Sequence, residues 1–245
     1  MRFDFNQPAN RHLIGPVWML PQRGSVTGGS MRPMNSYAVV RDHGSLLFDA
    51  PLSWTLDGIA ALAQSDHPPR ALVISHRDLA SSGDAYRTIR DRYGLRPLLH
   101  PDDQSTEAAR SSGIEWADWD APETRQIWTD FGVEPIHLPG HSPGSIVAYL
   151  SDDDHPNAGG ILLAGDSAVA PGPAQTDRTP RLERPMAADR DPRFIDRWKH
   201  LVDTRPISAI LPLHGSGYAR EDHPDTFDDI VANLWRGEPV DPTRR

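Results

Sequence analysis

The chain has 245 residues, of which 38% are hydrophobic and 24% are charged, and its 34 acidic residues outnumber the 25 basic ones. An α/β chain of this length often forms a single domain, and an acidic balance argues against nucleic acid as a partner. The chain contains no cysteine, which excludes disulfide bonds, cysteine-ligated zinc and a cysteine nucleophile.

Targeting and membrane signals are absent from the sequence. Residues 1–20 lack the basic segment and the apolar core of a signal peptide. No stretch approaches the roughly 18 uninterrupted apolar residues of a transmembrane helix. We therefore expect a cytoplasmic protein that has no membrane partner and acts on a small molecule, whereas the sequence leaves the oligomeric state open.

The first elements of the chain are two expected strands followed by a helix. Residues 34–40 and 45–49 are rich in apolar and β-branched side chains, and residues 41–44 between them have the composition of a hairpin turn. A helix with its apolar residues on one face is expected to begin at Ser53, which would cap it, and to end before Pro68.

The next two elements are a buried strand and a second helix. Residues 71–74 form a short apolar run of the kind found in buried strands. Ser82 or Asp84 would cap the helix that follows, and Gly94 would end it. Farther along, Trp116, Trp119 and Trp128 flank an expected loop–strand region, and we interpret them as core or interface residues.

The second half of the chain alternates in the same way. Strands are expected at residues 133–138, 145–150, 161–164 and 207–211. Helices are expected at residues 192–202 and 226–235, the latter within a C-terminal helical region at 223–236. The run Asp-Asp-Asp-His at residues 152–155 predicts a hairpin loop that is exposed to solvent. Residues 171–193 are rich in proline, arginine and aspartate, which predicts a long loop that is either a functional lid or disordered.

Polar residues follow the expected strands at four places. His76 and Asp78 follow one strand, and His141, Asp166 and His214 each follow another. Because strand ends on one edge of a sheet converge, these side chains are expected to lie together, and imidazole with carboxylate suits zinc or iron. Neighbouring glycines would allow the sharp turns that such a site needs. Taken alone, each histidine could equally be an ordinary surface or turn residue.

The motifs around these residues resemble those of the metallo-β-lactamase superfamily, an αββα sandwich of metallohydrolases. Residues 35–49 resemble the first hairpin of the family. The run Pro-Gly-His-Ser-Pro-Gly-Ser at residues 139–145 is a nearly complete match to its third motif, and residues 165–167 and 212–215 resemble the fourth and fifth.

This resemblance implies the fold class and the domain organisation. The expected class is α/β (α+β), a four-layer αββα sandwich of metallo-β-lactamase type. A single domain would span residues 1–245, with a core at about residues 34–216 and a C-terminal helix at 223–236.

The second motif departs from the family pattern. The family has His-x-His-x-Asp-His after the strand, which supplies ligands to two metals, whereas this chain has His-Arg-Asp-Leu-Ala-Ser at residues 76–81. Only His76 is kept, and Asp78, Ala80 and Ser81 replace the other three motif residues. Alanine cannot bind a metal and serine is a poor ligand for zinc. A two-metal centre is therefore not expected.

The remaining residues favour at most one metal ion, which would be zinc or iron. By the resemblance, His76, Asp78 and His141 would form a three-ligand face, with Asp166 as a fourth ligand. Because the motif aspartate is missing, Asp166 is also the candidate that accepts a proton, and His214 is the second candidate catalytic residue. The alternative is that no metal binds and that His76 and Asp78 form a hydrogen-bonded pair.

Three functions are compatible with this sequence. The first is a hydrolase with a reduced, mononuclear site that acts on an ester, thioester, amide-like or phosphoester bond. The second is a catalytically inactive superfamily member that serves as a binding or structural module, because a fold does not imply its family's activity. The third is a mononuclear iron protein of the dioxygenase-like kind. No motif identifies the substrate.

Overall fold

The structure is a computed structural model that describes residues 7–22, 34–50, 52–151, 159–171 and 179–238. It divides into two compact units, each built on one sheet. The N-terminal unit comprises residues 4–24 and 35–133, and the C-terminal unit comprises residues 1–3, 25–34 and 134–245.

The sheet of the N-terminal unit has the strand order β1-β2-β3-β4-β5. Its strands are β1 (Arg11–Ile14), β2 (Val17–Met19), β3 (Tyr37–Arg41), β4 (Gly44–Phe48) and β5 (Pro69–Val73). All neighbouring strands are antiparallel except β4 and β5, which run parallel. The parallel pair matters for the site because it brings the ends of β4 and β5 to the same edge.

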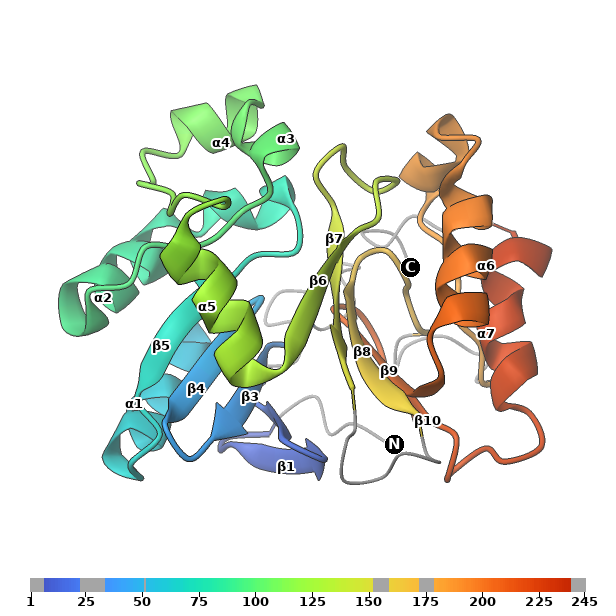
Figure 1. The fold of residues 1–245 in the computed structure, drawn as a ribbon, viewed down its shortest axis with the longest axis horizontal. Coiled ribbons are helices and arrows are strands. Elements are labelled where there is room, and N and C mark those ends of the chain that lie inside the picture. The colour runs from blue at the N-terminus through green and yellow to red at the C-terminus, as the bar shows by residue number, and fades with distance from the viewer. Residues whose placement is uncertain (1–6, 23–33, 51, 152–158, 172–178, 239–245) are drawn as a thin grey trace. The chain divides into compact units, whose positions relative to one another are not determined.

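Helices surround this sheet (Figure 1); two of them lie between β4 and β5, and the others follow β5 in the chain. They are η1 (Ser53–Thr55), α1 (Leu56–Gln64), η2 (Arg77–Ser81), α2 (Gly83–Tyr93), α3 (Pro101–Gln104), α4 (Glu107–Ser111) and α5 (Pro122–Phe131), where η denotes a 3₁₀ helix. The helix α2 ends as expected at Gly94, whose φ of 70° is a left-handed conformation that glycine adopts without strain.

The sheet of the C-terminal unit has the order β10-β9-β8-β7-β6, with β8 and β9 parallel. Its strands are β6 (Val133–His137), β7 (Ile146–Leu150), β8 (Gly160–Gly165), β9 (Ile207–Pro212) and β10 (Tyr218–Ala219). Its helices are η3 (Met186–Arg190), α6 (Phe194–Thr204) and α7 (Phe227–Arg236), and α6 and α7 lie side by side against the sheet (Figure 1).

The core of the C-terminal unit lies between this sheet and its helices. Phe194 and Trp198 of α6 and Phe227 of α7 are fully or almost fully buried with Leu162 and Ile210 of the sheet. Burying an apolar side chain of this size contributes about 1.5–3 kcal/mol to folding. The burial of these side chains therefore fixes α6 against the sheet. The first turns of α6 contact the loops that carry His141 and Asp166.

Every strand and helix expected from the sequence is present, with ends shifted by a few residues, but the N-terminal caps of α1 and α2 were predicted wrongly. Ser53 begins the 3₁₀ turn η1, and the residue before α1 is Thr55, which makes no capping bond through its side chain. Ser82 precedes α2 and also makes no such bond. The backbone thus starts these helices without the side-chain acceptor that the composition suggested.

Several described parts of the chain were not predicted, among them the helices α3, α4 and α5 and the strand β10. The hairpin β1–β2 had no assignment, and Trp128 lies on helix α5 rather than beside a strand. The described part of the long loop at 171–193, residues 179–193, is ordered by tertiary contacts: Glu183 exchanges backbone hydrogen bonds with Val169, and η3 follows. The expected hairpin loop at residues 152–155 lies outside the described residues.

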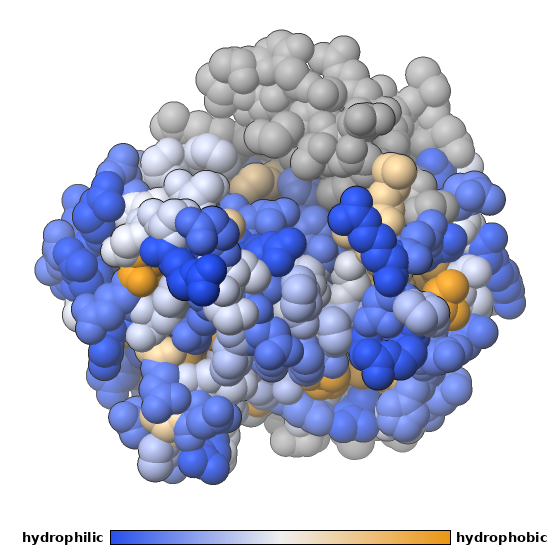
Figure 2. Space-filling view, turned by 90° about the horizontal axis from the view of Figure 1, so that it is seen from above, coloured by the Kyte–Doolittle hydropathy of each residue, from blue (hydrophilic) through white to orange (hydrophobic). Residues whose placement is uncertain are grey.

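Charged and polar side chains dominate the described surface, as the space-filling view in Figure 2 shows for one face. Among the described residues, Met186 is the one large hydrophobic side chain that is exposed, at 54%. No helix within the described part of the chain is both long enough and apolar enough to cross a membrane.

Candidate metal centre

His76 lies three residues after the end of β5, at the edge of the N-terminal sheet where β4 also ends. Its side chain is buried, and its Nδ1 lies 2.9 Å from the hydroxyl oxygen of Ser75. Because Nδ1 faces this hydroxyl, Nε2 is the nitrogen that could bind a metal. Such a hydrogen bond to the second ring nitrogen is how proteins orient ligating histidines.

Two buried carboxylates hold the backbone on both sides of His76. Asp49, directly after β4, accepts a hydrogen bond of 2.7 Å from the backbone N–H of Ser75. Asp103 of α3 accepts one of 3.0 Å from the backbone N–H of Arg77. Sequence reasoning had given neither aspartate a role. The signal for Asp49 was its position at a strand end, whereas Asp103 carried no local signal because its contact is 26 residues away in sequence.

Asp78 lies on the 3₁₀ turn η2 and has a very different environment. Its side chain is 61% exposed, and one carboxylate oxygen lies 3.8 Å from Nε of Arg77. On the same turn, Ala80 is buried and Ser81 is exposed, and the Ser81 hydroxyl donates to the backbone oxygen of Asp78. Among these three residues of η2, only Asp78 therefore offers a carboxylate to a metal. The hydroxyl of Ser81 is used in a hydrogen bond within the same turn.

Two tyrosines near Asp49 can be excluded as proton acceptors. Burial raises the pKa of Tyr37 and of Tyr86 well above the ordinary tyrosine range, and the negative charge of Asp49 raises both further. Both phenols therefore stay protonated at neutral pH. Tyr86 uses its proton in a hydrogen bond to the backbone oxygen of Leu79, next to the η2 residues described above.

His141 lies in the turn between β6 and β7, in the C-terminal unit. Ser142 and Ser145 close this turn: the Ser142 N–H donates to the Ser145 hydroxyl at 2.8 Å, and the two hydroxyls lie 2.8 Å apart. At its base, Leu138 N–H donates to the Ser145 carbonyl. These contacts give the two serines of the run at residues 139–145 a structural role, because they close the turn that carries His141.

Asp166 is the centre of the polar cluster in the C-terminal unit. It follows β8 and is 5% exposed, and it is flanked by two histidines. Nε2 of His141 lies 3.8 Å from Oδ2 of Asp166, and Nε2 of His214 lies 3.6 Å from Oδ1. Both imidazoles are largely buried. The structure therefore brings together three of the predicted site residues, one from each of three strand ends.

Glycines shape two of these strand ends. Gly165 precedes Asp166 with a φ of 52°, and Gly215 follows His214 with a φ of 88°. A methyl group added at Gly215 would lie 2.2 Å from the carbonyl oxygen of Ala170. Ala170 also donates its N–H to the backbone oxygen of His214. The close approach of these two segments, which positions His214, thus requires glycine.

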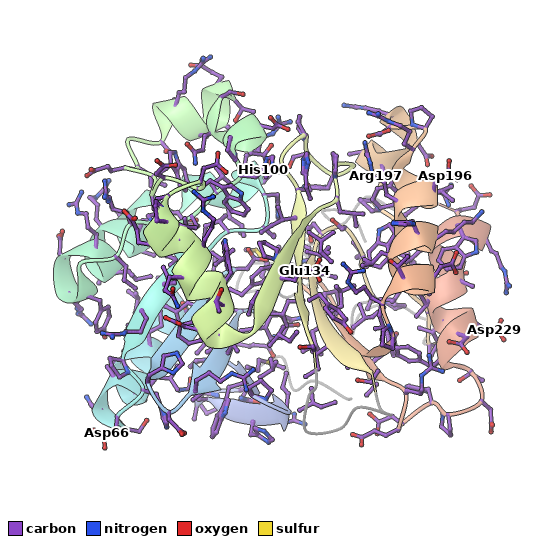
Figure 3. The ribbon with its side chains drawn as sticks, viewed as in Figure 1. Asp66, His100, Glu134, Asp196, Arg197 and Asp229 are labelled. Atoms are coloured by element: carbon purple, nitrogen blue, oxygen red, sulfur yellow. The ribbon has the colours of Figure 1, made fainter. Side chains whose placement is uncertain are left out.

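A further imidazole at the edge of the N-terminal sheet was missed. His100 follows residues 97–99, where Leu98 pairs in parallel with Val73 of β5, so its backbone is next to the end of β5. Its Nδ1 accepts from the backbone N–H of Asp102 at 3.3 Å, and its ring packs edge-on against Trp119 at 5.4 Å. Figure 3 labels its position near α3. The signal was the Leu-Leu-His pattern, an apolar pair ending in a histidine.

The predicted site residues thus fall into two sets. His76 and Asp78 stand at the sheet edge of the N-terminal unit, whereas His141, Asp166 and His214 form the cluster of the C-terminal unit. All of these residues carry donor atoms that suit zinc or iron.

No protein-family model matches the chain. In sequence, the chain is similar to the probable metallo-hydrolase YqgX of Bacillus subtilis (strain 168), with 26% identity over 143 residues, which are 54% of this chain and 67% of the relative.

Solved metallo-β-lactamase structures resemble the chain over most of its length. One from Erythrobacter litoralis, with β-mercaptoethanol in its active site, has a TM-score of 0.63 at 18% identity and covers 92% of this chain and 96% of its own. One from Hirschia baltica has a TM-score of 0.57 at 19% identity, with 91% and 96% covered. The structure of VMB-1 at pH 5.5 has a TM-score of 0.64 at 12% identity, with 93% and 98% covered.

These matches decide the fold. Each covers more than nine-tenths of this chain, so each includes parts of both units. The fold class expected from the sequence, the α/β sandwich of metallo-β-lactamase type, is confirmed. The sequence relative, whose printed name is that of a metallo-hydrolase, and the fold shared with the solved structures agree with the resemblance drawn from the motifs.

Proposed function

We propose that the protein is a metal-dependent hydrolase with a single metal ion, zinc or iron. His76, Asp78 and His141 would hold the ion, and Asp166 would be its fourth ligand. The observation that carries the proposal is the placement of the largely buried His141 imidazole beside the buried carboxylate of Asp166, with the His214 imidazole on the other side of that carboxylate. The metallo-hydrolase relative and the metallo-β-lactamase fold support the same chemistry.

The donor atoms in the C-terminal unit fit a metal. The separations of 3.6 and 3.8 Å between imidazole nitrogens and carboxylate oxygens exceed the 3.5 Å limit of a hydrogen bond between the same atoms. Two ligands bound at about 2.0–2.2 Å to one tetrahedral ion lie roughly 3.3–3.6 Å apart. His141 and Asp166, the two proposed ligands in this unit, are therefore separated by slightly more than the spacing that a shared ion requires.

The local structure of η2 supports one ion rather than two. Ala80 presents a buried methyl group, and the Ser81 hydroxyl is engaged with the backbone of its own turn. Of the residues that would serve a second ion, only Asp166 and His214 remain. One imidazole and a shared carboxylate fall short of the three protein ligands usual for catalytic zinc.

The residues of this chain would divide the work of hydrolysis. A bound metal would supply Lewis acidity that lowers the pKa of water and polarises a carbonyl or phosphoryl oxygen. Asp166, the buried carboxylate of the cluster, would accept the proton of the attacking water. His214, whose Nε2 lies 3.6 Å from Oδ1 of Asp166, would be the second residue to take part in proton transfer.

The proposed substrate is a small molecule with an ester, thioester, amide-like or phosphoester bond. We propose a cytoplasmic location and no nucleic-acid or membrane partner. A catalytically inactive binding module and an iron dioxygenase-like protein are the competing outcomes, and the assay below separates them by activity and by metal identity.

Replacing Asp166 by asparagine tests the proposed chemistry. Zinc-loaded and iron-loaded protein would be assayed on an ester, a thioester, an amide and a phosphodiester, with circular dichroism to check folding. On any substrate that is hydrolysed, Asp166→Asn should reduce the rate by about 100-fold or more, since a positioned base contributes 10²–10⁴-fold. Exposed Asp196 on α6 offers a matched control, because Asp196→Asn should retain full activity. Turnover unaffected by Asp166→Asn, or no turnover at all, would contradict the proposal.

Restoring the family motif tests why the site holds one ion. The triple substitution Asp78→His, Ala80→Asp and Ser81→His supplies the missing side chains, so the number of ions bound per chain should rise from one towards two. Elemental analysis of the folded triple variant measures this. The buried position of Ala80 makes the double variant Asp78→His, Ser81→His the appropriate fallback if the triple variant is unstable. An unchanged count in a folded variant would show that more than side chains is missing.

A further inference from the structure

One helix contacts the loops of two candidate ligands in the C-terminal unit. Phe194, Arg197 and Trp198 of α6 are spaced i, i+3 and i+4, so they share one face of the helix. Figure 3 shows Arg197 on the side of α6 towards the turn that joins β6 and β7, whereas Asp196 points the other way. The turn in question carries His141.

Arg197 and Phe194 hold this turn. The Arg197 guanidinium donates a hydrogen bond of 3.1 Å to the carbonyl oxygen of Pro139, two residues before His141. The Phe194 ring fills the space beside Gly140, where an added methyl group would lie 2.1 Å from Cδ2 of the ring. Phe194 itself is buried in the core. The turn is thus fixed by a polar contact and by close packing.

Trp198 holds the loop of the second ligand. Its indole Nε1–H donates to the carbonyl oxygen of Ser167 at 3.1 Å, one residue after Asp166, and the whole side chain is buried. Adjacent residues of one rigid helix therefore bind the backbone next to His141 and the backbone next to Asp166. The spacing between these two ligands is then set by the helix as well as by the sheet.

A carboxylate keeps Arg197 in place. Asp191 forms an ion pair of 2.6 Å with Arg197 and also accepts from the backbone N–H of Arg193 at 2.9 Å. The hydrogen bond from Arg193 and the charge of Arg197 lower the pKa of Asp191, so its carboxylate is ionised throughout the neutral range. A guanidinium held in this way has less freedom to leave the Pro139 carbonyl than an exposed one would.

We propose that Arg197 is a positioning residue, which holds the His141 turn at the distance from Asp166 that metal binding requires. The proposal rests on the proposed function only in taking His141 and Asp166 as ligands. Partners that orient metal ligands are worth about 10–100-fold in metal affinity, although they do not touch the metal. Arg197 would act in the same way, but through its hydrogen bond to the backbone of Pro139 rather than through a bond to the imidazole of His141.

The test compares Arg197→Met with two other substitutions on the same stretch of chain. Methionine keeps an apolar stem and removes the donor, and Arg197→Lys keeps one charged donor. Arg193→Met is the matched control, because Arg193 also lies near Asp191 but its side chain is 75% exposed and 3.7 Å from that carboxylate. Circular dichroism and thermal unfolding establish that each variant is folded.

The first readout needs no metal. In metal-free protein, amide hydrogen exchange within residues 139–145 should become about tenfold faster or more in Arg197→Met, because a hydrogen bond from a charged donor is lost. It should stay unchanged in Arg193→Met, and exchange in β8 and β9 should be unchanged in both. Unaltered exchange in the His141 turn of Arg197→Met would overturn the proposal, whether or not the protein binds metal.

The second readout is the metal itself. Zinc affinity, measured by chelator competition, should fall about 10–100-fold in Arg197→Met, recover at least partly in Arg197→Lys, and stay within twofold of the parent in Arg193→Met. The visible spectrum of cobalt-substituted protein should change in Arg197→Met alone. Equal affinity and an identical cobalt spectrum in Arg197→Met would overturn the proposal. A parent protein that binds no metal would instead overturn the proposed function, while the exchange result would still decide the role of Arg197.

Discussion

Replacing His141 by alanine is expected to abolish metal-dependent hydrolysis and to leave the fold intact. His141 contributes Nε2 to the cluster around Asp166, at 3.8 Å, and its side chain is 12% exposed. The turn that carries it is closed by Ser142 and Ser145 and held by α6, so the backbone does not depend on the imidazole. Zinc affinity should fall by more than the roughly 100-fold expected for an outer partner, because a direct ligand is lost.

His200 supplies the control for this experiment. It lies exposed on α6, so His200→Ala removes an imidazole from the same unit without touching the cluster. Metal content, circular dichroism and turnover on the substrate panel would be measured for both variants. Retained activity and retained metal in folded His141→Ala protein would remove this residue from the site.

The second large effect is expected from Gly215→Ala, on stability. Gly215 has a φ of 88°, and its added methyl group would lie 2.2 Å from the carbonyl oxygen of Ala170. A left-handed conformation costs an L-residue about 1–2 kcal/mol, and overpacking against a backbone that cannot move away costs about 1–3 kcal/mol more. We therefore expect the free energy of unfolding to fall by about 2–5 kcal/mol, with displacement of the adjacent His214.

Gly94→Ala separates the two contributions. Gly94 also has a positive φ, 70°, but among the described residues no atom lies within 4 Å of an added methyl group. Its substitution should cost only about 1–2 kcal/mol. Urea unfolding of both variants measures the difference, and equal losses of stability would show that the contact between Gly215 and Ala170 is not as close as described.

The sequence predicted the strands well because buried strands have a local signature. Runs such as residues 71–74 and 207–211 are short and largely apolar, and a histidine follows each run within three residues. The same pattern identified His141, Asp166 and His214, since strand ends must meet where parallel strands share an edge. The cluster around Asp166 is the structural consequence of that rule.

The parts that escaped prediction depend on contacts between distant residues. Asp103 holds the backbone after His76 from a position 26 residues away, and Arg197 contacts Pro139 across 58 residues. The segment around Glu183 looked like a loop by composition, but pairing with Val169 orders it. No local pattern encodes such pairings. The predicted caps at Ser53 and Ser82 were wrong for a different reason. The sequence there is typical of helix caps, but 3₁₀ turns begin at Ser53 and end next to Ser82.

The residues of η2 account for the absence of ligands to a second metal ion. The replacement of three motif residues was visible in the sequence and led to the expectation of at most one ion. The structure adds the reasons in physical terms: Ala80 is buried, Ser81 bonds to its own turn, and Asp78 is exposed beside Arg77.

The number of metal ions bound per chain tests the central claim most directly. The 245-residue protein would be incubated with zinc or with iron(II), passed through a desalting column and analysed by native mass spectrometry. One ion per chain, lost in His76→Ala and in His141→Ala, is the predicted result. Two tightly bound ions per chain, or none with either metal, would contradict a mononuclear site built from His76, Asp78, His141 and Asp166.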